Sequence, residues 1–289
     1  MVPDSLVATQ RSAQGCDASA SANLQTQTIT VIILCGGLGS RMYEETELRP
    51  KPMLEIGGRP MLWHIMQVYA AHGFREFILC LGYKGHVIKD YFLNYRAYQS
   101  DCTVRLGDST RIEYHQSAHV PDWSVTLAET GQAAQTGARV LRGGRYVRGD
   151  TFCLTYGDGL SDINLHELLA FHRGHGKIGT VTGVRPPGRF GELEIDPLGR
   201  ATQFNEKPQV TEGVINGGFF IFQRAFLDHH LQDRDDVVLE QEPLQQLARA
   251  GELMVYPHKG FWQPMDTHRE FKLLNELWAT GQAPWKVWS

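Results

Sequence analysis

The chain has 289 residues, of which 42% are hydrophobic and 21% are charged, and its formal net charge is −4. This length suffices for one large domain or two modest ones, with a core that needs no disulfide or metal to hold it together. The slightly acidic balance excludes a broad basic surface, so we expect no nucleic-acid partner.

The first 28 residues are rich in Ser, Thr, Ala and Gln and show no hydrophobic period, which predicts a disordered extension or an artefact of the chosen start site. No apolar run approaches the roughly 18 residues of a membrane span, and none follows a basic segment like that of a signal peptide. We therefore expect a cytoplasmic protein with no membrane partner. The five cysteines are odd in number and lack C-x-x-C spacing, which predicts reduced, mostly buried thiols.

From Ile29 onward, short β-branched runs alternate with amphipathic stretches, a pattern typical of an α/β fold with a mostly parallel sheet and helices on both faces. The pattern also predicts a more antiparallel portion of the sheet, and it shows no internal repeat or long linker, so we expect a single catalytic domain over residues 29–289. The expected strands are 28–35, 75–83, 151–159, 179–184, 191–196 and 214–222, and the expected helices are 61–73, 86–98, 166–176, 237–251 and 268–281.

A glycine-rich loop follows the first expected strand, in the stretch LCGGLGSRMYEETELRPKPM. The dinucleotide fingerprint G-x-G-x-x-G fails, because its third glycine falls on Met42. A Walker A loop fails too, since its Gly-Lys pair falls on Arg41 and Met42. Both of the best-known phosphate loops are therefore excluded.

The loop nevertheless suits an anion. Glycines directly after a strand let backbone N–H groups approach a phosphate with no Cβ in the way. Ser40 adds a hydroxyl donor, Arg41 a charged fork, and Lys51 a point charge held between two prolines. A tight turn followed by a surface loop is the alternative, but the combination favours a triphosphate site.

Asp158 lies in a Gly-Asp-Gly turn at the carboxyl end of the expected strand that begins at Thr151. Ligands of open α/β sheets bind outside the carboxyl ends of the strands, so the glycine loop and Asp158 should project toward the same rim. A carboxylate flanked by glycines leaves room for Mg²⁺ and a nucleotide. An aspartate that merely closes a turn is the alternative.

These residues resemble a known family. GGLGSR with the downstream RPKPMLEIGG is similar to the signature of sugar-1-phosphate nucleotidyltransferases, with Ser40 in place of the usual threonine. The resemblance continues through TYGDG, PPGRFGELEID, FNEKP, INGGFF and FWQPMDT, and so covers nearly all of the chain from Ile29. Within the family it is greatest for the members that transfer a cytidylyl group, because of SRMYEET, VTLAETG, TGARV and APWKVW.

The resemblance implies a Rossmann-like sheet of the nucleotide-diphospho-sugar transferase type. It also implies transfer of a cytidylyl group from CTP to glucose 1-phosphate with release of pyrophosphate, dependence on Mg²⁺, a homo-oligomer and a role in bacterial surface polysaccharide. The sugar phosphate is itself the nucleophile, so no catalytic base is needed and charge neutralisation carries the reaction. A uridylyl- or thymidylyltransferase and a catalytically silent regulatory relative are the alternatives.

The resemblance also assigns site residues. Arg41 and Lys51 are expected to act in catalysis, and Asp158 and Asp266 to bind the metal, although Asp266 could instead cap the helix that starts near Thr267. The expected nucleotide-binding residues are Leu34, Gly36, Gly37, Leu38, Gly39, Ser40, Arg41, Lys51, Arg139 and Gly157. The expected sugar-phosphate-binding residues are Gly191, Glu206, Lys207, Asn216 and Gly217.

Several of these assignments have structural alternatives. The Glu206–Lys207 pair could be an exposed turn, and the glycines a β-bulge or a tight strand crossing. Recognition of cytosine is expected in residues 126–139, where Ala134 replaces the serine of a relative. His172 and His175 are three apart on an expected helix, but the sequence offers no third ligand nearby, so we interpret them as surface residues.

Overall fold

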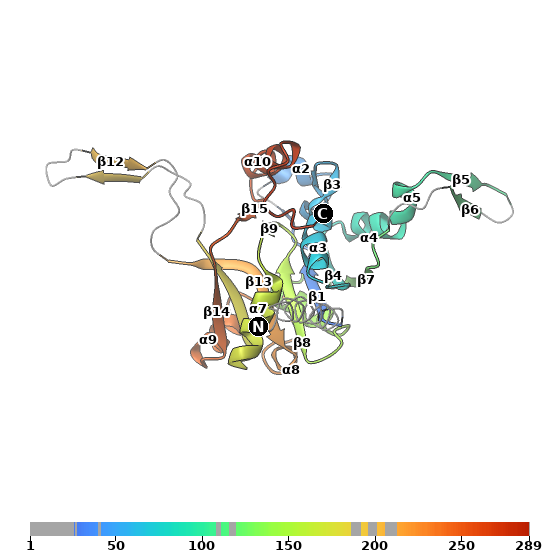
Figure 1. The fold of residues 1–289 in the computed structure, drawn as a ribbon. Coiled ribbons are helices and arrows are strands. Elements are labelled where there is room, and N and C mark those ends of the chain that lie inside the picture. Colours follow the sequence, from blue (N-terminus) through green and yellow to red (C-terminus); the bar gives the residue numbers. More distant parts are fainter. Residues whose placement is uncertain are drawn as a thin grey trace, which may run out of the picture.

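Seven strands form the central sheet of the computed structural model, which describes residues 26, 28–39, 42–107, 111–115, 120–185, 192–195, 201–205 and 213–288. The strands are β1 (Thr30–Leu34), β4 (Glu76–Leu81), β7 (Ser124–Glu129), β8 (Thr151–Tyr156), β10 (Gly179–Val184), β13 (Ile215–Gln223) and β14 (Leu253–His258). Their order is β14-β10-β13-β8-β1-β4-β7 (Figure 1). Strand β13 runs antiparallel to both of its neighbours, and every other pairing is parallel. The expected mostly parallel sheet is confirmed.

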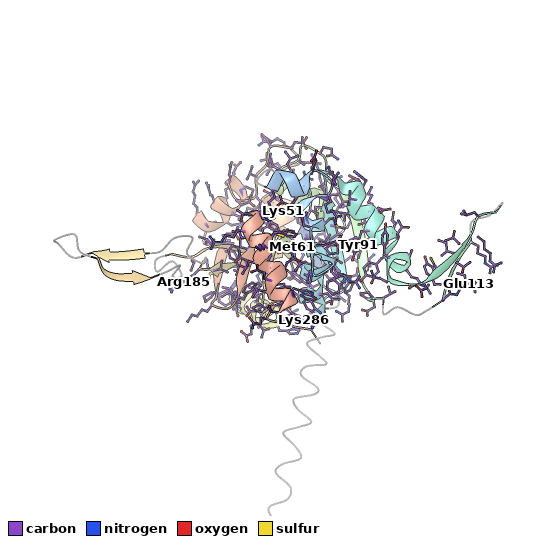
Figure 2. All side chains as sticks on the ribbon, turned by 90° about the horizontal axis from the view of Figure 1, so that it is seen from above. Lys51, Met61, Tyr91, Glu113, Arg185 and Lys286 are labelled. Carbon is purple, nitrogen blue, oxygen red and sulfur yellow. The ribbon has the colours of Figure 1, made fainter. Side chains whose placement is uncertain are left out.

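Four short strand pairs lie outside this sheet. They are β2 (Glu55–Ile56) with β3 (Arg59–Pro60), β5 (Cys102–Arg105) with β6 (Arg111–Tyr114), β9 (Gly159–Ser161) with β15 (Trp262–Pro264), and β11 (Glu192–Ile195) with β12 (Ala201–Asn205). The view from above shows Lys51 and Met61 over the body of the molecule and Glu113 far out on the β5–β6 hairpin (Figure 2). The strand expected over residues 191–196 is β11, which pairs with β12 in a separate hairpin and is not part of the central sheet.

Helices cover both faces of the central sheet. They are α2 (Tyr43–Thr46), the 3₁₀ turn η2 (Lys51–Met53), α3 (Met61–Ala71), α4 (Gly85–Leu93), α5 (Tyr95–Gln99), α6 (Thr136–Gly144), α7 (Leu165–His175), α8 (Ala225–His229), α9 (Glu242–Arg249) and α10 (His268–Ala279). Buried side chains of α3, α7 and α10 join one hydrophobic cluster, and those of α6, α8 and α9 join the other. None of these helices combines the length and apolar character needed to cross a membrane.

Side chains of strand β1 pack into both hydrophobic clusters, one on each face of the central sheet. Val31 and Ile33 belong to one hydrophobic cluster, whereas Ile32 and Leu34 belong to the other. Side chains alternate across a strand, so a strand buried on both faces must be apolar throughout. Each fully buried residue of this kind contributes about 1.5–3 kcal/mol. The core therefore needs no disulfide, and the four described cysteines are free, three of them buried as expected.

The helices begin and end close to the expected positions, with two differences. The side chains of Leu62, Ile65, Met66 and Tyr69 form a buried stripe on α3, and Gly73 follows the helix with a positive φ of 87°. The helix expected over residues 86–98 is divided at Asn94 into α4 and α5. The helix expected from residue 237 begins only at Glu242, because Pro243 lacks an amide N–H and fits only the first turn.

His172 corrects the expectation that the paired histidines lie at the surface. It is only 3% exposed, and its Nδ1 lies 2.8 Å from the hydroxyl of Thr180, which also contacts Nε2 of the half-buried His175 at 2.7 Å. Burial lowers the pKa of His172 to about 4. The pair is therefore a neutral packing contact between α7 and β10.

Most of the expected N-terminal extension, residues 1–25 and 27, lies outside the described residues, as does Cys16. Thr26 is buried and donates a hydrogen bond to the carbonyl of His72 at 3.1 Å, and Ile29 N–H donates to its carbonyl at 3.1 Å. Thr26, three residues before the expected boundary, thus contacts the folded domain.

Candidate active site

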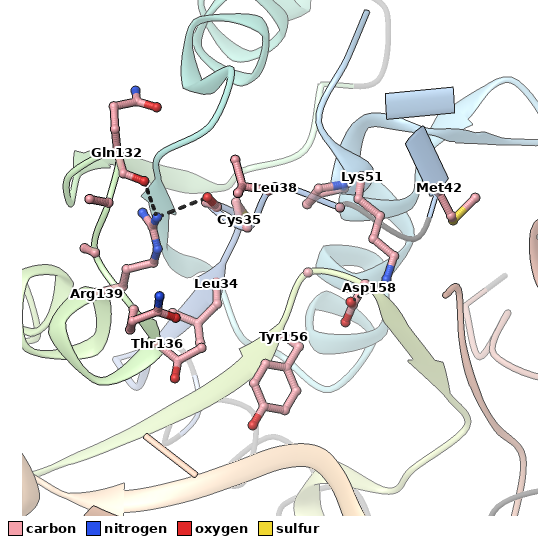
Figure 3. A pocket seen from close by; sticks show the side chains of 18 of the residues that line it. Leu34, Cys35, Leu38, Met42, Lys51, Gln132, Thr136, Arg139, Tyr156 and Asp158 are labelled. Atoms are coloured by element: carbon pink, nitrogen blue, oxygen red, sulfur yellow. Dashed lines mark hydrogen bonds and ion pairs between the residues drawn. The ribbon is translucent and has the colours of Figure 1, made fainter. Parts of the chain in front are cut away.

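A cavity of about 470 Å³ opens where the parallel strands β1 and β8 end (Figure 3). Its wall comes from five segments that are far apart in the sequence, and the lining residues are Leu34–Gly39, Met42, Lys51, Pro52, Gln132–Thr136, Arg139, Tyr156–Asp158 and Asp266. The glycine loop and Asp158 therefore share one rim, as the strand-end rule predicted.

The glycines of the loop after β1 have different roles. A Cβ on Gly36 would lie 2.1 Å from Nη1 of Arg139, so no side chain fits there. Gly39 has a φ of +63°, a conformation that favours glycine. A Cβ on Gly37 would meet nothing within 4 Å, which leaves open space beside this part of the loop. The loop can therefore offer its backbone to a ligand at Gly37 while Gly36 packs against the wall.

Arg139 forms that wall. Its Nη1 donates to the carbonyl of Leu81 and to the hydroxyl of Thr130, both at 2.9 Å. Its Nη2 donates to the carbonyl of Gly36 at 3.1 Å and to that of Gln132 at 3.4 Å (Figure 3). Burial lowers its pKa from the ordinary value, yet an arginine remains charged. Both terminal nitrogens are thus engaged in joining the loop that follows β1 to the segment before α6.

Lys51 connects the two aspartates expected to bind metal. Its Nζ lies 2.8 Å from Oδ2 of Asp158 and 2.6 Å from Oδ1 of Asp266. Burial alone would lower the pKa of Lys51, but the carboxylates outweigh burial and the pKa lies above its ordinary value. Pro50 and Pro52 flank the lysine in the 3₁₀ turn η2 and stiffen the backbone that carries it. Three segments thereby converge on one cluster of charges.

A hydrogen bond to Glu270 holds the backbone of Asp266, and Asp266 is not itself the N-cap of helix α10. Thr267 is the N-cap of α10, and the capping box with Glu270 is complete, so the alternative assignment of Asp266 as the cap is wrong. Oε2 of Glu270 accepts hydrogen bonds from the N–H groups of Asp266 at 2.6 Å and of Thr267 at 2.9 Å. In addition, Met265 N–H donates to the carbonyl of Asp158 at 2.8 Å, which joins the two aspartate segments directly.

The two carboxylates fit a divalent cation. They already share one positive group, the Lys51 ammonium, in the wall of a cavity large enough for a nucleotide. Among the described residues, no three His, Cys, Asp or Glu side chains are grouped to enclose a metal by themselves. A magnesium ion commonly binds one or two carboxylates and completes its shell with phosphate oxygens and water, so the site would need the substrate as a ligand.

Cys35 is the thiol-bearing residue among those that line the cavity. It is 1% exposed, and burial is the main cause that raises its pKa well above the ordinary value. The nucleophile of a cysteine enzyme is the thiolate, and this thiol stays protonated near neutral pH. A thiolate nucleophile at Cys35 is therefore disfavoured.

The expected sugar-phosphate side is only partly described. Gly191, Glu206 and Lys207 lie outside the described residues, as do Ser40 and Arg41 of the glycine loop. Asn216 and Gly217 do not line the cavity, but Asn216 donates a hydrogen bond at 3.2 Å to the hydroxyl of Tyr156, which does. The register between β10 and β13 shifts between Val181 and Gly183, where Gly183 pairs with Asn216, so the pairing is irregular beside Asn216 and Gly217.

Sequence reasoning missed two polar residues near the cavity. Tyr156 precedes Gly157 in the TYGDG turn, and its position at the end of a buried strand could have drawn attention to it. Glu240 accepts hydrogen bonds from the hydroxyls of Tyr156 and Thr136, but it lies 84 residues beyond Tyr156 and no motif contains it. The remaining lining residues near Thr136 fall within the segment expected to recognise the base.

A mostly parallel sheet that presents a glycine loop, a lysine and two aspartates at one rim defines a nucleotide-binding α/β enzyme. The chain belongs to the Nucleotidyl transferase family, whose sequence model matches residues 30–276. Members of this family generally use a divalent metal.

Several proteins of known name are similar to this chain over most of its length. The chain is 50% identical to glucose-1-phosphate cytidylyltransferase of Salmonella typhi over 258 residues, which cover 89% of this chain and 98% of that protein. It is 44% identical to the probable glucose-1-phosphate cytidylyltransferase of Bacillus subtilis over 257 residues, covering 89% and 99% of the two chains. It is 28% identical to mannose-1-phosphate guanyltransferase of Neurospora crassa, covering 83% of this chain and 61% of that protein.

Solved structures support the fold. HddC from Yersinia pseudotuberculosis, complexed with GMP-PN, has a TM-score of 0.63 at 21% identity, with 86% of this chain and 99% of that chain covered. A putative glucose-1-phosphate thymidylyltransferase from Bacillus anthracis has a TM-score of 0.61 at 18% identity, with 86% and 94% covered. The Rossmann-like fold expected from the sequence is thus confirmed.

Proposed function

We propose that this chain transfers a cytidylyl group from CTP to α-D-glucose 1-phosphate and releases CDP-glucose and pyrophosphate. The observation that carries this function is the meeting of Lys51, Asp158 and Asp266 beside the glycine loop. The names of the relatives at 50% and 44% identity supply the base and the sugar. A uridylyl- or thymidylyltransferase and a silent regulatory relative are not favoured by these relatives.

The reaction is a displacement between two anions. An oxygen of the sugar phosphate forms a bond to the α-phosphorus of CTP, and the bond from that phosphorus to the bridging oxygen of pyrophosphate breaks. The attacking phosphate is mostly dianionic near neutral pH, since a phosphate monoester has a second pKa of about 6. Catalysis then depends on bringing the two anions into line and neutralising their charge.

The residues divide these tasks. The backbone at Gly37 and Gly39 is proposed to approach the triphosphate, and Lys51, together with Arg41 from outside the described residues, to neutralise its charge. Asp158 and Asp266 would hold Mg²⁺, which when bound supplies positive charge to the phosphate oxygens. The described residues that line the cavity are proposed to position the nucleotide.

The sugar phosphate is proposed to bind toward β13. Asn216 and Gly217 lie on that side, and Gly191, Glu206 and Lys207 are proposed to complete the pocket. A homo-oligomer, a single catalytic domain over residues 29–289 and a cytoplasmic location remain predictions from the sequence.

A nucleotide panel tests this function. Pyrophosphate release is measured with glucose 1-phosphate and either CTP, UTP, dTTP, GTP or ATP in the presence of Mg²⁺, and the sugar nucleotide is identified by mass spectrometry. We expect CTP to be preferred and CDP-glucose to form, and we expect Asp158→Asn to lose the turnover while it keeps the folded circular dichroism spectrum. Preference for dTTP or UTP would contradict the base assignment, and binding of CTP without turnover under any condition would favour the regulatory relative.

A further inference from the structure

Two hydroxyl groups in the cavity wall converge on one carboxylate. Thr136, at the start of α6, donates to Oε2 of Glu240 at 2.7 Å. Tyr156, at the end of β8, donates to Oε1 of the same residue. Thr136 and Tyr156 line the cavity (Figure 3), whereas Glu240 is an exposed residue of the segment before α9 and is not among the lining residues. The carboxylate therefore contacts two parts of the wall without being part of it.

The hydrogen bonds fix the direction of both hydroxyl protons. An ionised carboxylate only accepts hydrogen bonds, so the protons of Thr136 and Tyr156 must both point toward Glu240. The oxygen of Thr136 also accepts from Leu239 N–H at 2.9 Å. Burial, followed by the nearby charge of Glu240, raises the pKa of Tyr156, so this hydroxyl stays protonated at working pH. With their protons committed, both oxygens can offer only lone pairs to a ligand.

A third side chain extends the chain of contacts toward the expected sugar side. Asn216 donates through Nδ2 to the Tyr156 oxygen at 3.2 Å and accepts from Gly218 N–H through Oδ1 at 2.9 Å. The bond from the Gly218 amide fixes which side of the Asn216 amide is the oxygen. Because Tyr156 gives its proton to Glu240, its oxygen is left to accept from Asn216. The directions of the Thr136 and Tyr156 protons thus follow from Glu240, whereas the Asn216 amide is oriented by Gly218 and donates to the lone pair that Tyr156 leaves free.

The ring and the helix are positioned without Glu240. The Tyr156 ring packs edge-to-face on Phe220, with centroids 5.8 Å apart, and a Cβ on Gly218 would lie 2.5 Å from it. The start of α6 is fixed by backbone bonds from Gln135 N–H to the carbonyl of Asp235 at 2.8 Å and from Gly137 N–H to that of Val237 at 2.9 Å. Loss of the carboxylate should therefore release the hydroxyl protons and leave the wall in place.

We propose that Glu240 is a positioning residue that makes Thr136 and Tyr156 hydrogen-bond acceptors and so couples the nucleotide side of the cavity to the sugar side. Thr136 then accepts from a donor on the nucleotide, either the exocyclic amino group of cytosine or a ribose hydroxyl. Tyr156 accepts from Asn216 and, together with the Gly218 amide, holds this side chain for the hydroxyl groups of the hexose phosphate. This role rests on the proposed function, because it assigns substrates to the two sides.

The kinetic signature differs from that of a stability defect. Glu240→Ala is expected to raise KM for both CTP and glucose 1-phosphate, each about tenfold, which is the size of one lost hydrogen bond to a substrate group. Thr136→Val should raise KM for CTP alone, and Asn216→Ala should raise KM for glucose 1-phosphate alone. Glu240→Gln keeps one acceptor oxygen and should recover part of the loss. Glu242→Ala, an exposed neighbour bonded to Gln246, is the matched control and should behave as wild type.

A double variant tests the path through the tyrosine. In the Tyr156→Phe background, the hydroxyl that joins Glu240 to Asn216 is absent, so Glu240→Ala should no longer change KM for glucose 1-phosphate. Its effect on CTP, measured independently of turnover by titration calorimetry, should remain. If Glu240→Ala weakens binding of CTP but not of UTP, the exocyclic amino group of cytosine is the donor to Thr136. If it weakens binding of both nucleotides equally, the donor is a ribose hydroxyl.

Other outcomes would overturn the proposal. If Glu240→Ala lowers only the melting temperature or kcat and leaves both KM values within twofold of wild type, Glu240 serves the fold alone. If the Tyr156→Phe background leaves the effect on glucose 1-phosphate intact, the coupling does not pass through Tyr156. Failure of the proposed function is distinguishable, since wild type itself would then neither bind CTP nor form CDP-glucose.

Discussion

Arg139 places its positive charge inside the cavity wall, where it serves the protein backbone. Its four hydrogen bonds reach Leu81, Thr130, Gly36 and Gln132, which come from three different segments of the chain. The resemblance to the family suggests a direct contact with the nucleotide, but both terminal nitrogens already have acceptors. The geometry therefore favours an indirect effect, through the shape of the loop at Gly36.

Replacing Arg139 by lysine separates these two roles. Lysine keeps the charge but lacks the planar fork, so it cannot make all four of these hydrogen bonds. The carbonyls of Leu81 and Gly36 keep other donors, from Thr130 and Tyr83, so the cost is that of the lost hydrogen bonds, about 1 kcal/mol each and more for a charged donor. We expect Arg139→Lys to lower the free energy of unfolding by about 2–3 kcal/mol in urea and to raise KM for CTP about tenfold through the loosened loop.

Arg145→Lys is the control for this substitution, because Arg145 is largely exposed and pairs with Asp233. It should change neither stability nor KM measurably. Should Arg139→Lys keep wild-type stability and lose only CTP affinity, Arg139 contacts the nucleotide directly, as the sequence resemblance implies.

Single residues also show why sequence reasoning stops where it does. The glycine loop, Lys51 and Asp158 could be expected to share a rim, because each lies next to a strand whose direction the pattern predicts. The hydrogen bonds of Arg139 to the protein backbone could not be expected, since its partner Gly36 is 103 residues away in the sequence. The burial of His172 likewise depends on Thr180, which pairs with it only once β10 has joined the sheet.

Helix α10 contacts both the Asp266 segment and the turn that follows the Lys51 segment. Its N-terminus carries the capping box that holds the backbone of Asp266. Farther along the helix, Oδ1 of Asn275 accepts from Gly57 N–H at 3.1 Å, and a Cβ on Gly57 would lie 1.9 Å from Trp278. Gly57 lies in the turn between β2 and β3, just beyond the 3₁₀ turn of Lys51. The helix thereby fixes the distance between an aspartate and the lysine that contacts it.

The capping residues predict a separation of stability from metal affinity. Thr267→Ala removes one cap and should lower the free energy of unfolding by about 1 kcal/mol. Glu270→Ala also frees the N–H of Asp266, so it should additionally raise the Mg²⁺ concentration for half-maximal turnover several-fold. Glu270→Gln keeps an acceptor oxygen and is the control. Equal Mg²⁺ requirements for Glu270→Ala and Thr267→Ala would show that the capping box does not position Asp266.

At the level of elements, the hydrophobic pattern predicted most of the central sheet. Strands β1, β4 and β8 were expected because each is a short apolar run bounded by polar residues or turn signals. The short pairs such as β9 with β15 were not, because Trp262 and Ser161 pair across a long stretch of chain. The pairing brings Asp158 beside Asp266, so the metal-binding assignment of Asp266 required the family resemblance.

Acid should destabilise the whole molecule through histidines in two separate regions. His64 is fully buried on α3, where its Nε2 lies 2.8 Å from the carbonyl of Ile56 and Trp285 donates to its Nδ1 at 3.4 Å. Burial lowers its pKa to about 4, and the positive charge of Arg59 acts in the same direction. His172 lies on α7 against Thr180, and burial lowers its pKa to about 4 as well, with His175 and Arg173 contributing.

The sign and size of this effect can be checked by denaturation at several pH values. An unfolded histidine titrates near 6.5, above its folded pKa of about 4, so the stability that each neutral ring contributes is complete above pH 6.5 and is lost as the pH falls toward 4. We expect each histidine to lower the free energy of unfolding by about 2 kcal/mol as the pH falls from 7 to 5. In urea unfolding series, His64→Gln and His172→Gln should each reduce this acid-induced loss of unfolding free energy by that amount. His229→Gln, at an exposed position, should keep the wild-type dependence of the unfolding free energy on pH. A pH dependence that is the same in all three variants would exclude both buried rings as its source and would leave the carboxylate pairs to explain it.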